Sequence, residues 1–124
     1  LMVLYNSLKG DSWKENDHWG TRNNNICAWK KVKCSNNNET IIKLELSGNQ
    51  LEGHIPAEIE ILNGLEELHI FKNSLNGTAP WTSITKLTKL QILDMRENNF
   101  NGNLTTTDFK ALELLTKFHL SNNT

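Results

Sequence analysis

Residues 65–73, LEELHIFKN, carry the pattern that decides the fold. Apolar side chains stand at the first, fourth and sixth positions of this stretch, and an asparagine closes it. The same arrangement returns in IIKLELSGN (41–49), LQILDMREN (90–98) and LTKFHLSNN (115–123), with closing asparagines spaced 24 or 25 residues apart. Four matches in one register indicate an internal repeat, which outweighs any single motif.

The spacing within each unit has a direct physical meaning. The fourth and sixth positions alternate as in a β-strand and place two apolar side chains on one face. One strand cannot bury that face alone, but stacked units can, so the pattern predicts a parallel sheet running along a solenoid. We expect the closing asparagine at a buried turn, where its amide both donates to and accepts from the turn backbone. Stacked turns would then form an asparagine ladder.

These units resemble the leucine-rich repeats of plant-type extracellular proteins, as found in receptor-like kinase and receptor-like protein ectodomains. The stretch NQLEGHIPAEIEIL (49–62) matches the pattern N-x-L-x-G-x-I-P-x-x-I-x-x-L of that class. NSLNGTAPWTSITKL (73–87) keeps most of it with one inserted residue, and NNFNGNLTTTDFKAL (98–112) keeps it without the proline. The resemblance implies an α/β solenoid: a right-handed superhelix with a parallel concave β-sheet.

The chain divides into a cap and a repeat array. We expect an N-terminal cap over residues 1–40 and repeats over 41–124, at 41–64, 65–89, 90–114 and an incomplete 115–124. The last unit lacks its second half and no C-terminal cap follows, so we expect a piece of a longer solenoid. An open end would leave an apolar patch partly uncovered. That patch would contain Leu104, Phe109, Leu112, Phe118 and Leu120.

The stretch CAWKKVKC (27–34) holds both cysteines of the chain. A disulfide needs Cα atoms within about 7 Å, closer than a seven-residue separation allows on a helix or a straight strand. If Cys27 and Cys34 are bonded, the segment must therefore fold back. The stretch is similar to the C-x-W-x-G-V-x-C segment of the family's cap through Trp29 and Val32. This resemblance implies a disulfide that seals the first repeat, and Lys31 at the glycine position leads us to expect a looser turn.

Other roles for the two cysteines lead to other compartments. A zinc site would need about four ligands, and the chain has no C-x-x-C. A pair of free buried thiols would suit a cytosolic protein, whereas a disulfide implies an oxidising compartment. We therefore predict an extracellular location. Four N-x-S/T sequons, about the number that chance gives, permit N-glycosylation at Asn38, Asn76, Asn103 and Asn122.

Length and charge exclude several classes of partner. A chain of 124 residues fits one domain. Its net charge of −1 disfavours binding to nucleic acid or to an anionic membrane surface. No apolar run approaches the 18 residues of a membrane span, so membrane attachment would come only through segments outside this chain. We expect no cofactor.

The concave face is expected to present the third, fifth, seventh and eighth positions of the four units, because strand side chains alternate. Stacking turns these positions into columns. The columns are Lys43, Glu67, Ile92, Lys117; Glu45, His69, Asp94, His119; Ser47, Phe71, Arg96, Ser121; and Gly48, Lys72, Glu97, Asn122. From them we take as candidate ligand-binding residues Glu45, Glu67, His69, Phe71, Lys72, Ile92, Asp94, Arg96, Glu97 and His119.

The fifth-position column allows three interpretations. Its two carboxylates and two imidazoles could chelate a metal, form part of a hydrolytic triad, or form a ladder of opposite charges. A triad needs a nucleophile close to the histidine in a pocket that excludes water, which an open sheet does not supply. Cross-strand charge pairs need no further role. We favour the ladder, and predict no catalytic residue and no metal site.

Phe71 is the unusual member of the concave face. An aromatic side chain beside Arg96 and Ile92, surrounded by charges, has the composition of a binding hot spot. A single exposed aromatic residue can equally be incidental. The resemblance implies a non-catalytic extracellular recognition module of a receptor or receptor-like protein, whose ligand is a protein, a peptide, another ectodomain or a wall-derived molecule. The alternative is a secreted inhibitor of a partner enzyme, similar to the polygalacturonase inhibitors, whose repeat arrays are longer.

Overall fold

The computed structural model describes residues 1–21, 25–103 and 109–124. In chain order, the elements within these ranges are α1 (Met2–Ser7), η1 (Gly10–Ser12), η2 (Ile26–Ala28), β1 (Val32–Cys34), β2 (Ile41–Glu45), β3 (Glu52–Gly53), η3 (Ala57–Ile61), β4 (Glu67–His69), β5 (Ser74–Thr78), α2 (Trp81–Ile84), β6 (Ile92–Asp94), β7 (Asn99–Asn101) and β8 (Lys117–His119). None of the helices in these ranges has the length and apolar character needed to cross a bilayer.

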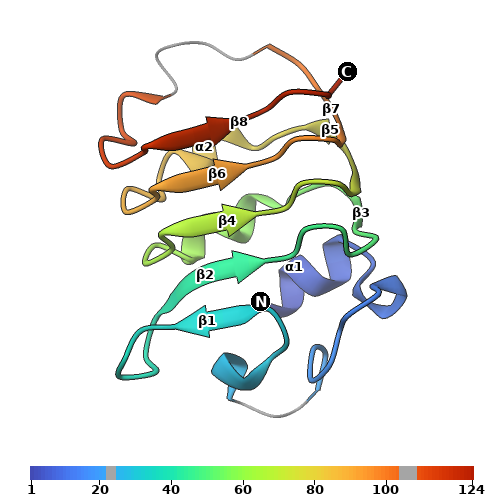
Figure 1. Ribbon diagram of the computed structural model, residues 1–124, viewed down its shortest axis with the longest axis vertical. Helices are drawn as coiled ribbons and strands as arrows, with labels where there is room; N and C mark the ends of the chain where they lie inside the picture. Colours follow the sequence, from blue (N-terminus) through green and yellow to red (C-terminus); the bar gives the residue numbers. More distant parts are fainter. Residues whose placement is uncertain (22–24, 104–108) are drawn as a thin grey trace.

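The main sheet has the strand order β1-β2-β4-β6-β8. Figure 1 shows β2, β4, β6 and β8 stacked in the same direction, with β1 antiparallel beside β2. The fourth-position residues Leu44, Leu68, Leu93 and Phe118 are partners across neighbouring strands. This register is the one that the sequence repeat predicts, and the predicted solenoid is confirmed.

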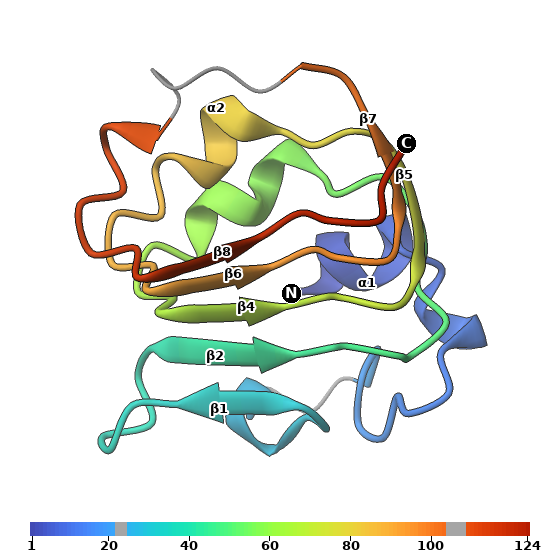
Figure 2. The ribbon, with the colours of Figure 1, turned by 45° about the horizontal axis from the view of Figure 1, so that its top comes forward.

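A second parallel sheet, β3-β5-β7, forms where the chain leaves the asparagine turns of the first three repeats. Beyond it the chain enters η3 or α2, which lie across the core from the main sheet (Figure 2). Gly53 of β3 has φ +99°, and a Cβ there would lie 2.5 Å from the Ser7 carbonyl oxygen. Glycine at this position therefore lets the second sheet approach the end of α1.

The core lies between the main sheet and the segments that return behind it. In the first three units all nine residues at the first, fourth and sixth positions are at most 7% exposed, as the pattern predicts. In the fourth unit Leu115, Phe118 and Leu120 are only half-buried. The expected apolar patch differs in detail, because Leu112 is buried at 4% exposed. Leu104 lies outside the described residues.

The predicted asparagine ladder is present. Asn98 is representative: its Nδ2 donates to the carbonyl oxygen of Met95 in its own turn, at 3.2 Å, and to that of Ile70 in the preceding repeat, at 2.9 Å. Its Oδ1 accepts the backbone N–H of Leu75, also in the preceding repeat, at 3.0 Å. Asn73 and Asn123 make the corresponding bonds one repeat away. Each side chain thus joins its own turn to the repeat before it.

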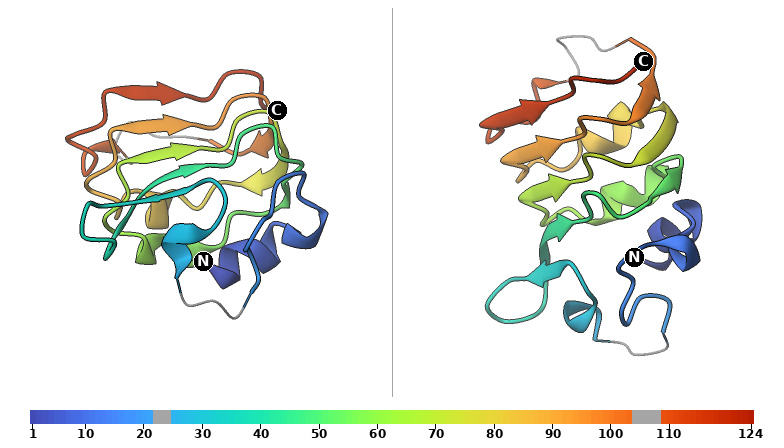
Figure 3. Two further views of the ribbon diagram at one scale, coloured as in Figure 1. Left: turned by 60° about the horizontal axis from the view of Figure 1, so that its bottom comes forward. Right: turned by 45° about the vertical axis from the view of Figure 1, so that its right-hand side comes forward.

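The N-terminal cap continues this bonding where the repeats begin. Glu15 takes the place of a preceding repeat, because its N–H donates to Asn49 Oδ1 at 2.6 Å and its carbonyl oxygen accepts from Asn49 Nδ2 at 3.0 Å. The interior of the cap is an aromatic cluster (Tyr5, Trp13, Trp19 and Trp29), and all four side chains are buried. Figure 3 shows this cap packed against the first-repeat end of the stack.

The cysteine segment folds back as a disulfide requires. Cys27 and Cys34 are bonded, with Cα atoms 5.6 Å apart, and no free cysteine is found among the described residues. Lys31, at the family's glycine position, has φ +70°. Our expectation of a looser turn was therefore wrong, because the lysine itself adopts the left-handed conformation that glycine would take. Its Nζ lies 3.3 Å from a carboxylate oxygen of Glu15.

Candidate functional site

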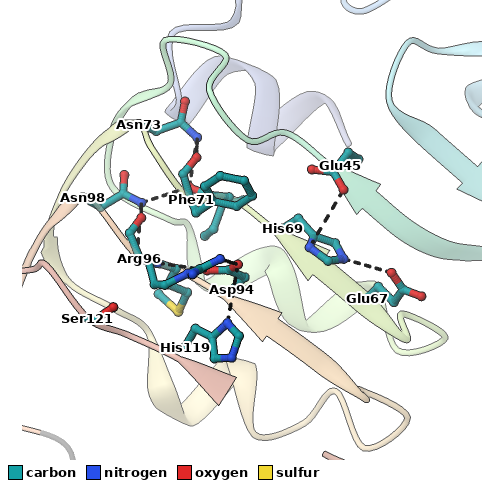
Figure 4. Close-up of polar contacts among 12 residues, drawn as sticks. Glu45, Glu67, His69, Phe71, Asn73, Asp94, Arg96, Asn98, His119 and Ser121 are labelled. Carbon is teal, nitrogen blue, oxygen red and sulfur yellow. Dashed lines mark hydrogen bonds and ion pairs between the residues drawn. The ribbon is translucent and has the colours of Figure 1, made fainter. Parts of the chain in front are cut away.

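The concave face is the best candidate site because it gathers most of the partly exposed ionic side chains into registered rows. Glu45 pairs across the strands with His69, His69 with Asp94, and Asp94 with His119. Parallel strands lie about 4.8 Å apart, so these side chains are immediate neighbours. Figure 4 shows the Glu45–His69 and Asp94–His119 contacts, each between neighbouring strands.

A four-membered ionic network covers β2 and β4. His69 Nε2 lies 2.9 Å from Glu67 Oε2, and His69 Nδ1 lies 3.9 Å from Glu45 Oε2. Lys43 Nζ lies 3.0 Å from the Glu67 carboxylate and 3.7 Å from that of Glu45. The hydrogen bonds from His69 and then from Lys43 lower the pKa of Glu67 below its ordinary value, although partial burial opposes them.

A second group, over β6, fixes the position of Arg96. Its Nε and Nη2 donate to the two carboxylate oxygens of Asp94 at 2.9 and 2.6 Å, a bidentate pair. The Arg96 guanidinium carbon lies 5.3 Å from the centre of the Phe71 ring, within the range of a cation–π contact. His119 Nδ1 lies 3.7 Å from Asp94 Oδ2. Arg96 is thus held from two sides.

Asp94 itself is only 5% exposed. Burial tends to raise the pKa of Asp94, but the side-chain and backbone hydrogen bonds with Arg96 outweigh it and hold this pKa below its ordinary value. The same contacts raise the pKa of Arg96. Asp94 stands in its predicted column, yet an arriving partner would meet Arg96, with 38% of its side chain exposed, before the carboxylate.

The observed contacts of the fifth-position column are pairwise. Glu45–His69 and Asp94–His119 lie as the charge ladder predicts, and each is a pair of opposite charge when its imidazole is protonated. Across the described ranges, no group of three or more His, Cys, Asp or Glu residues is arranged to hold a metal ion. The arrangement offers ionic and aromatic contacts to a partner.

The remaining predicted residues lie around these two groups. Ile92 is half-buried on β6, and Lys72 and Glu97 are exposed at the rim. Lys72 has φ +55° and Glu97 has φ +51°, so at the rim of two successive repeats a residue other than glycine adopts the left-handed backbone conformation. Lys43 was not among our candidates, although it bridges two of them. Its place in the third-position column, beside Glu45 and Glu67, was the available signal.

The four sequon asparagines are all exposed. Asn38 lies in the turn between β1 and β2, Asn76 on β5 of the second sheet, and Asn122 at the rim of the concave face. Asn103 follows β7, and the threonine that completes its sequon lies outside the described residues. Glycans at Asn38 or Asn76 would therefore leave the centre of the concave face open.

Comparison with known proteins places these features in context. No family model matches the chain. Receptor-like kinase TMK4 of Arabidopsis thaliana is 40% identical over 77 residues, which are 62% of this chain and 8% of that protein. The chain spans only about a tenth of the length of the curated relatives it matches.

Two solved structures extend the likeness over nearly the whole chain. A chain in the BIR3–SERK2 complex from Arabidopsis thaliana is 30% identical, with a TM-score of 0.80 over 99% of this chain and 68% of that one. The LRR ectodomain of the receptor kinase SOBIR1 from the same plant is 26% identical, with a TM-score of 0.78 over 98% of this chain and 63% of that one.

Proposed function

Because the chain belongs to the plant-type leucine-rich-repeat family of receptor-like kinases and receptor-like proteins, we propose that it is a non-catalytic, extracellular recognition module. It binds a protein or peptide through its concave face. The single observation that carries this proposal is the Phe71–Arg96 pair, held by Asp94 at the centre of that face. An extracellular location agrees with the Cys27–Cys34 disulfide.

The physics of the pair supports binding. Aromatic and arginine side chains are the residue types enriched at binding hot spots, and a ring of charged residues around them helps to exclude water. Arg96 is already ordered by Asp94 and Phe71, so it loses little conformational freedom when a partner arrives. The pair therefore offers a preorganised anchor.

The class of partner follows from the same chemistry and from the relatives. An open sheet of ionic and aromatic side chains suits an extended peptide or another protein surface. The BIR3–SERK2 structure is a complex of two proteins, and we propose that a second ectodomain is among the partners of this chain as well. No feature of the described residues favours the enzyme-inhibitor alternative.

Alanine substitution at the anchor tests the proposal. Candidate ectodomains and peptides are first screened for binding to the chain by surface plasmon resonance. For a partner so found, Phe71→Ala and Arg96→Ala should each weaken binding by about 1–3 kcal/mol, because each removes a hot-spot contact. Phe71 lies outside the buried core, so Phe71→Ala should change thermal unfolding little. Arg96→Ala also leaves the buried Asp94 carboxylate without its bidentate partner and should lower the melting temperature, so binding is measured well below the unfolding transition of each variant.

The matched controls lie on the opposite side of the molecule. Ile61, 71% exposed, is the apolar control and Lys86 the basic one. Ile61→Ala and Lys86→Ala should leave binding unchanged. If the Phe71 and Arg96 variants bind a confirmed partner as tightly as the controls do, the partner uses another surface and the proposal is wrong.

A further inference from the structure

The concave face is balanced in charge apart from its histidines. Its sixteen positions include four basic residues, Lys43, Lys72, Arg96 and Lys117, and four acidic ones, Glu45, Glu67, Asp94 and Glu97. Imidazole is the side chain whose ordinary pKa places a change of charge between pH 5 and 8. His69 and His119 therefore set the net charge of the face, which is zero with both neutral and +2 with both protonated.

His69 is placed so that protonation changes its contacts as well as its charge. Only 16% of its side chain is exposed, and its two ring nitrogens face Glu67 and Glu45 at 2.9 and 3.9 Å. Lys43 contacts the same two carboxylates from β2. On the other side of His69, on β6, the Asp94 carboxylate is hydrogen-bonded to Arg96. Imidazolium donates from both nitrogens, but neutral imidazole leaves one lone pair toward a carboxylate. The contact from His69 on β4 to Glu45 on β2 is therefore an ion-pair bridge only in the protonated form, and it adds to the Lys43–Glu67 bridge between the same two strands.

His119 gives the same response on β8. Its Nδ1 lies 3.7 Å from Asp94 Oδ2, and 46% of its side chain is exposed. Arg96, two residues beyond Asp94 at the end of β6, faces the same carboxylate, and Lys117 lies two residues before His119 on β8. Because Arg96 already forms a bidentate ion pair with Asp94, a proton on His119 adds a second positive charge beside the same carboxylate.

We propose that protonation of His69 and His119 switches the concave face from neutral to positively charged, so that acidic partner segments bind more tightly at pH 5.5 than at pH 7.5. The inference rests on the proposed function, since it describes regulation of the same face. Couplings of this kind between two binding events commonly change affinity five-fold or more. We expect about a five-fold change for an acidic segment.

A measurement on the free protein tests the switch without any partner. The ring ¹⁵N shifts of His69 and the carboxylate ¹³C shifts of Glu45 and Glu67 are followed by NMR from pH 5 to 8. The two carboxylates should respond at the same midpoint as the His69 ring, and the response should vanish in His69→Gln. Carboxylate shifts that ignore the imidazole midpoint would overturn the bridge, whatever the fate of the recognition function.

The binding arm uses hexa-aspartate as a defined acidic probe, since its carboxylates stay ionised in this range. The native chain should bind it about five-fold more tightly at pH 5.5 than at pH 7.5. His69→Gln/His119→Gln should lose this ratio. The control pair His18→Gln/His54→Gln removes the two other histidines of the chain, which lie in the cap and beside the second sheet, and should keep it. No binding at pH 5.5, or an unchanged ratio in the first pair, overturns the proposal.

Discussion

Asp94 lies beneath the surface of the concave face and holds Arg96 in position there. Alternation along the strand predicted an outward side chain, and Asp94 does stand in that column. Arg96 then folds over it, so that the carboxylate is buried while the guanidinium remains accessible. Sequence reasoning could place both residues on one face, but the order of the two layers depends on side-chain packing against Phe71, which no spacing rule contains.

The buried pair makes a prediction for stability. Asp94→Asn should lower the free energy of unfolding at pH 7 by about 1–3 kcal/mol, because it removes hydrogen bonds to a charged group. Glu97→Gln, at the exposed rim, should change stability by less than about 0.5 kcal/mol. Urea titration of both variants measures the difference.

The pH dependence of this difference follows from the pKa of Asp94. That pKa lies below its ordinary value in the folded protein, so the carboxylate stabilises the fold above about pH 4, the ordinary Asp range. The stabilisation is lost as the pH falls through the folded pKa. Native protein and Asp94→Asn should therefore converge in stability at strongly acidic pH, and a constant gap down to pH 2 would contradict this account.

Asn98 should be the most sensitive polar residue of the repeats. Asn98→Ala removes three donated bonds and one accepted bond at a side chain only 6% exposed. We expect a loss of about 2–4 kcal/mol in the free energy of unfolding, since buried backbone groups lose their partners. The neighbouring Asn99, exposed on β7, is the control, and its alanine variant should unfold almost like the native protein.

At the scale of elements, the main sheet could be predicted and the second sheet could not. The strands β2, β4, β6 and β8 are predicted by apolar residues at fixed positions of the repeat. In β5, by contrast, Ser74, Asn76 and Thr78 are exposed and only Leu75 is buried, which gives no clear strand pattern. Its pairing with β3 and β7 arises because the stacking of the main sheet brings these segments side by side.

Two glycines allow the stability cost of backbone strain to be distinguished from the cost of a steric clash. Gly48 (φ +60°) and Gly53 (φ +99°) both have left-handed φ, but a Cβ at Gly48 would meet nothing within 4 Å, whereas one at Gly53 meets the Ser7 carbonyl oxygen. Gly48→Ala should cost about 1 kcal/mol for its conformation alone. Gly53→Ala should cost clearly more, because α1 must also shift. Equal changes in melting temperature for the two variants would contradict this, because they would mean that α1 moves away from β3 without a cost in stability.

At the scale of the whole molecule, the residue at the sixth position of each of the first three repeats donates its N–H to the strand of the next repeat. The backbone N–H groups of Leu46, Ile70 and Met95 each donate to a carbonyl oxygen of the next strand, at 2.8, 2.9 and 2.9 Å. Leu120 is the equivalent residue of the fourth unit, and the described residues contain no such acceptor for it. Burial declines in the same direction, from Leu44 at 0% exposed to the half-buried Phe118.

Hydrogen exchange should follow this gradient in the 124-residue chain. The amides of Leu46 and Ile70 should be strongly protected, and that of Leu120 should exchange at least about tenfold faster than that of Met95. Measurement at two protein concentrations serves as the control for self-association. A Leu120 amide as protected as Met95 at high dilution would contradict the expected gradient.

The asparagine ladder has a consequence for how such a gene changes over generations. Each asparagine of the ladder joins its own unit to the unit before it, through partners that recur 22 or 23 and 27 or 28 positions earlier. A duplication or deletion of one whole unit, about 25 codons, leaves each asparagine facing an equivalent partner. An insertion of another length within a strand or its asparagine turn breaks the ladder at that point. Selection on folding alone therefore allows the array to lengthen or shorten in whole units. The cap determines which unit is the first, because Glu15 is hydrogen-bonded to Asn49.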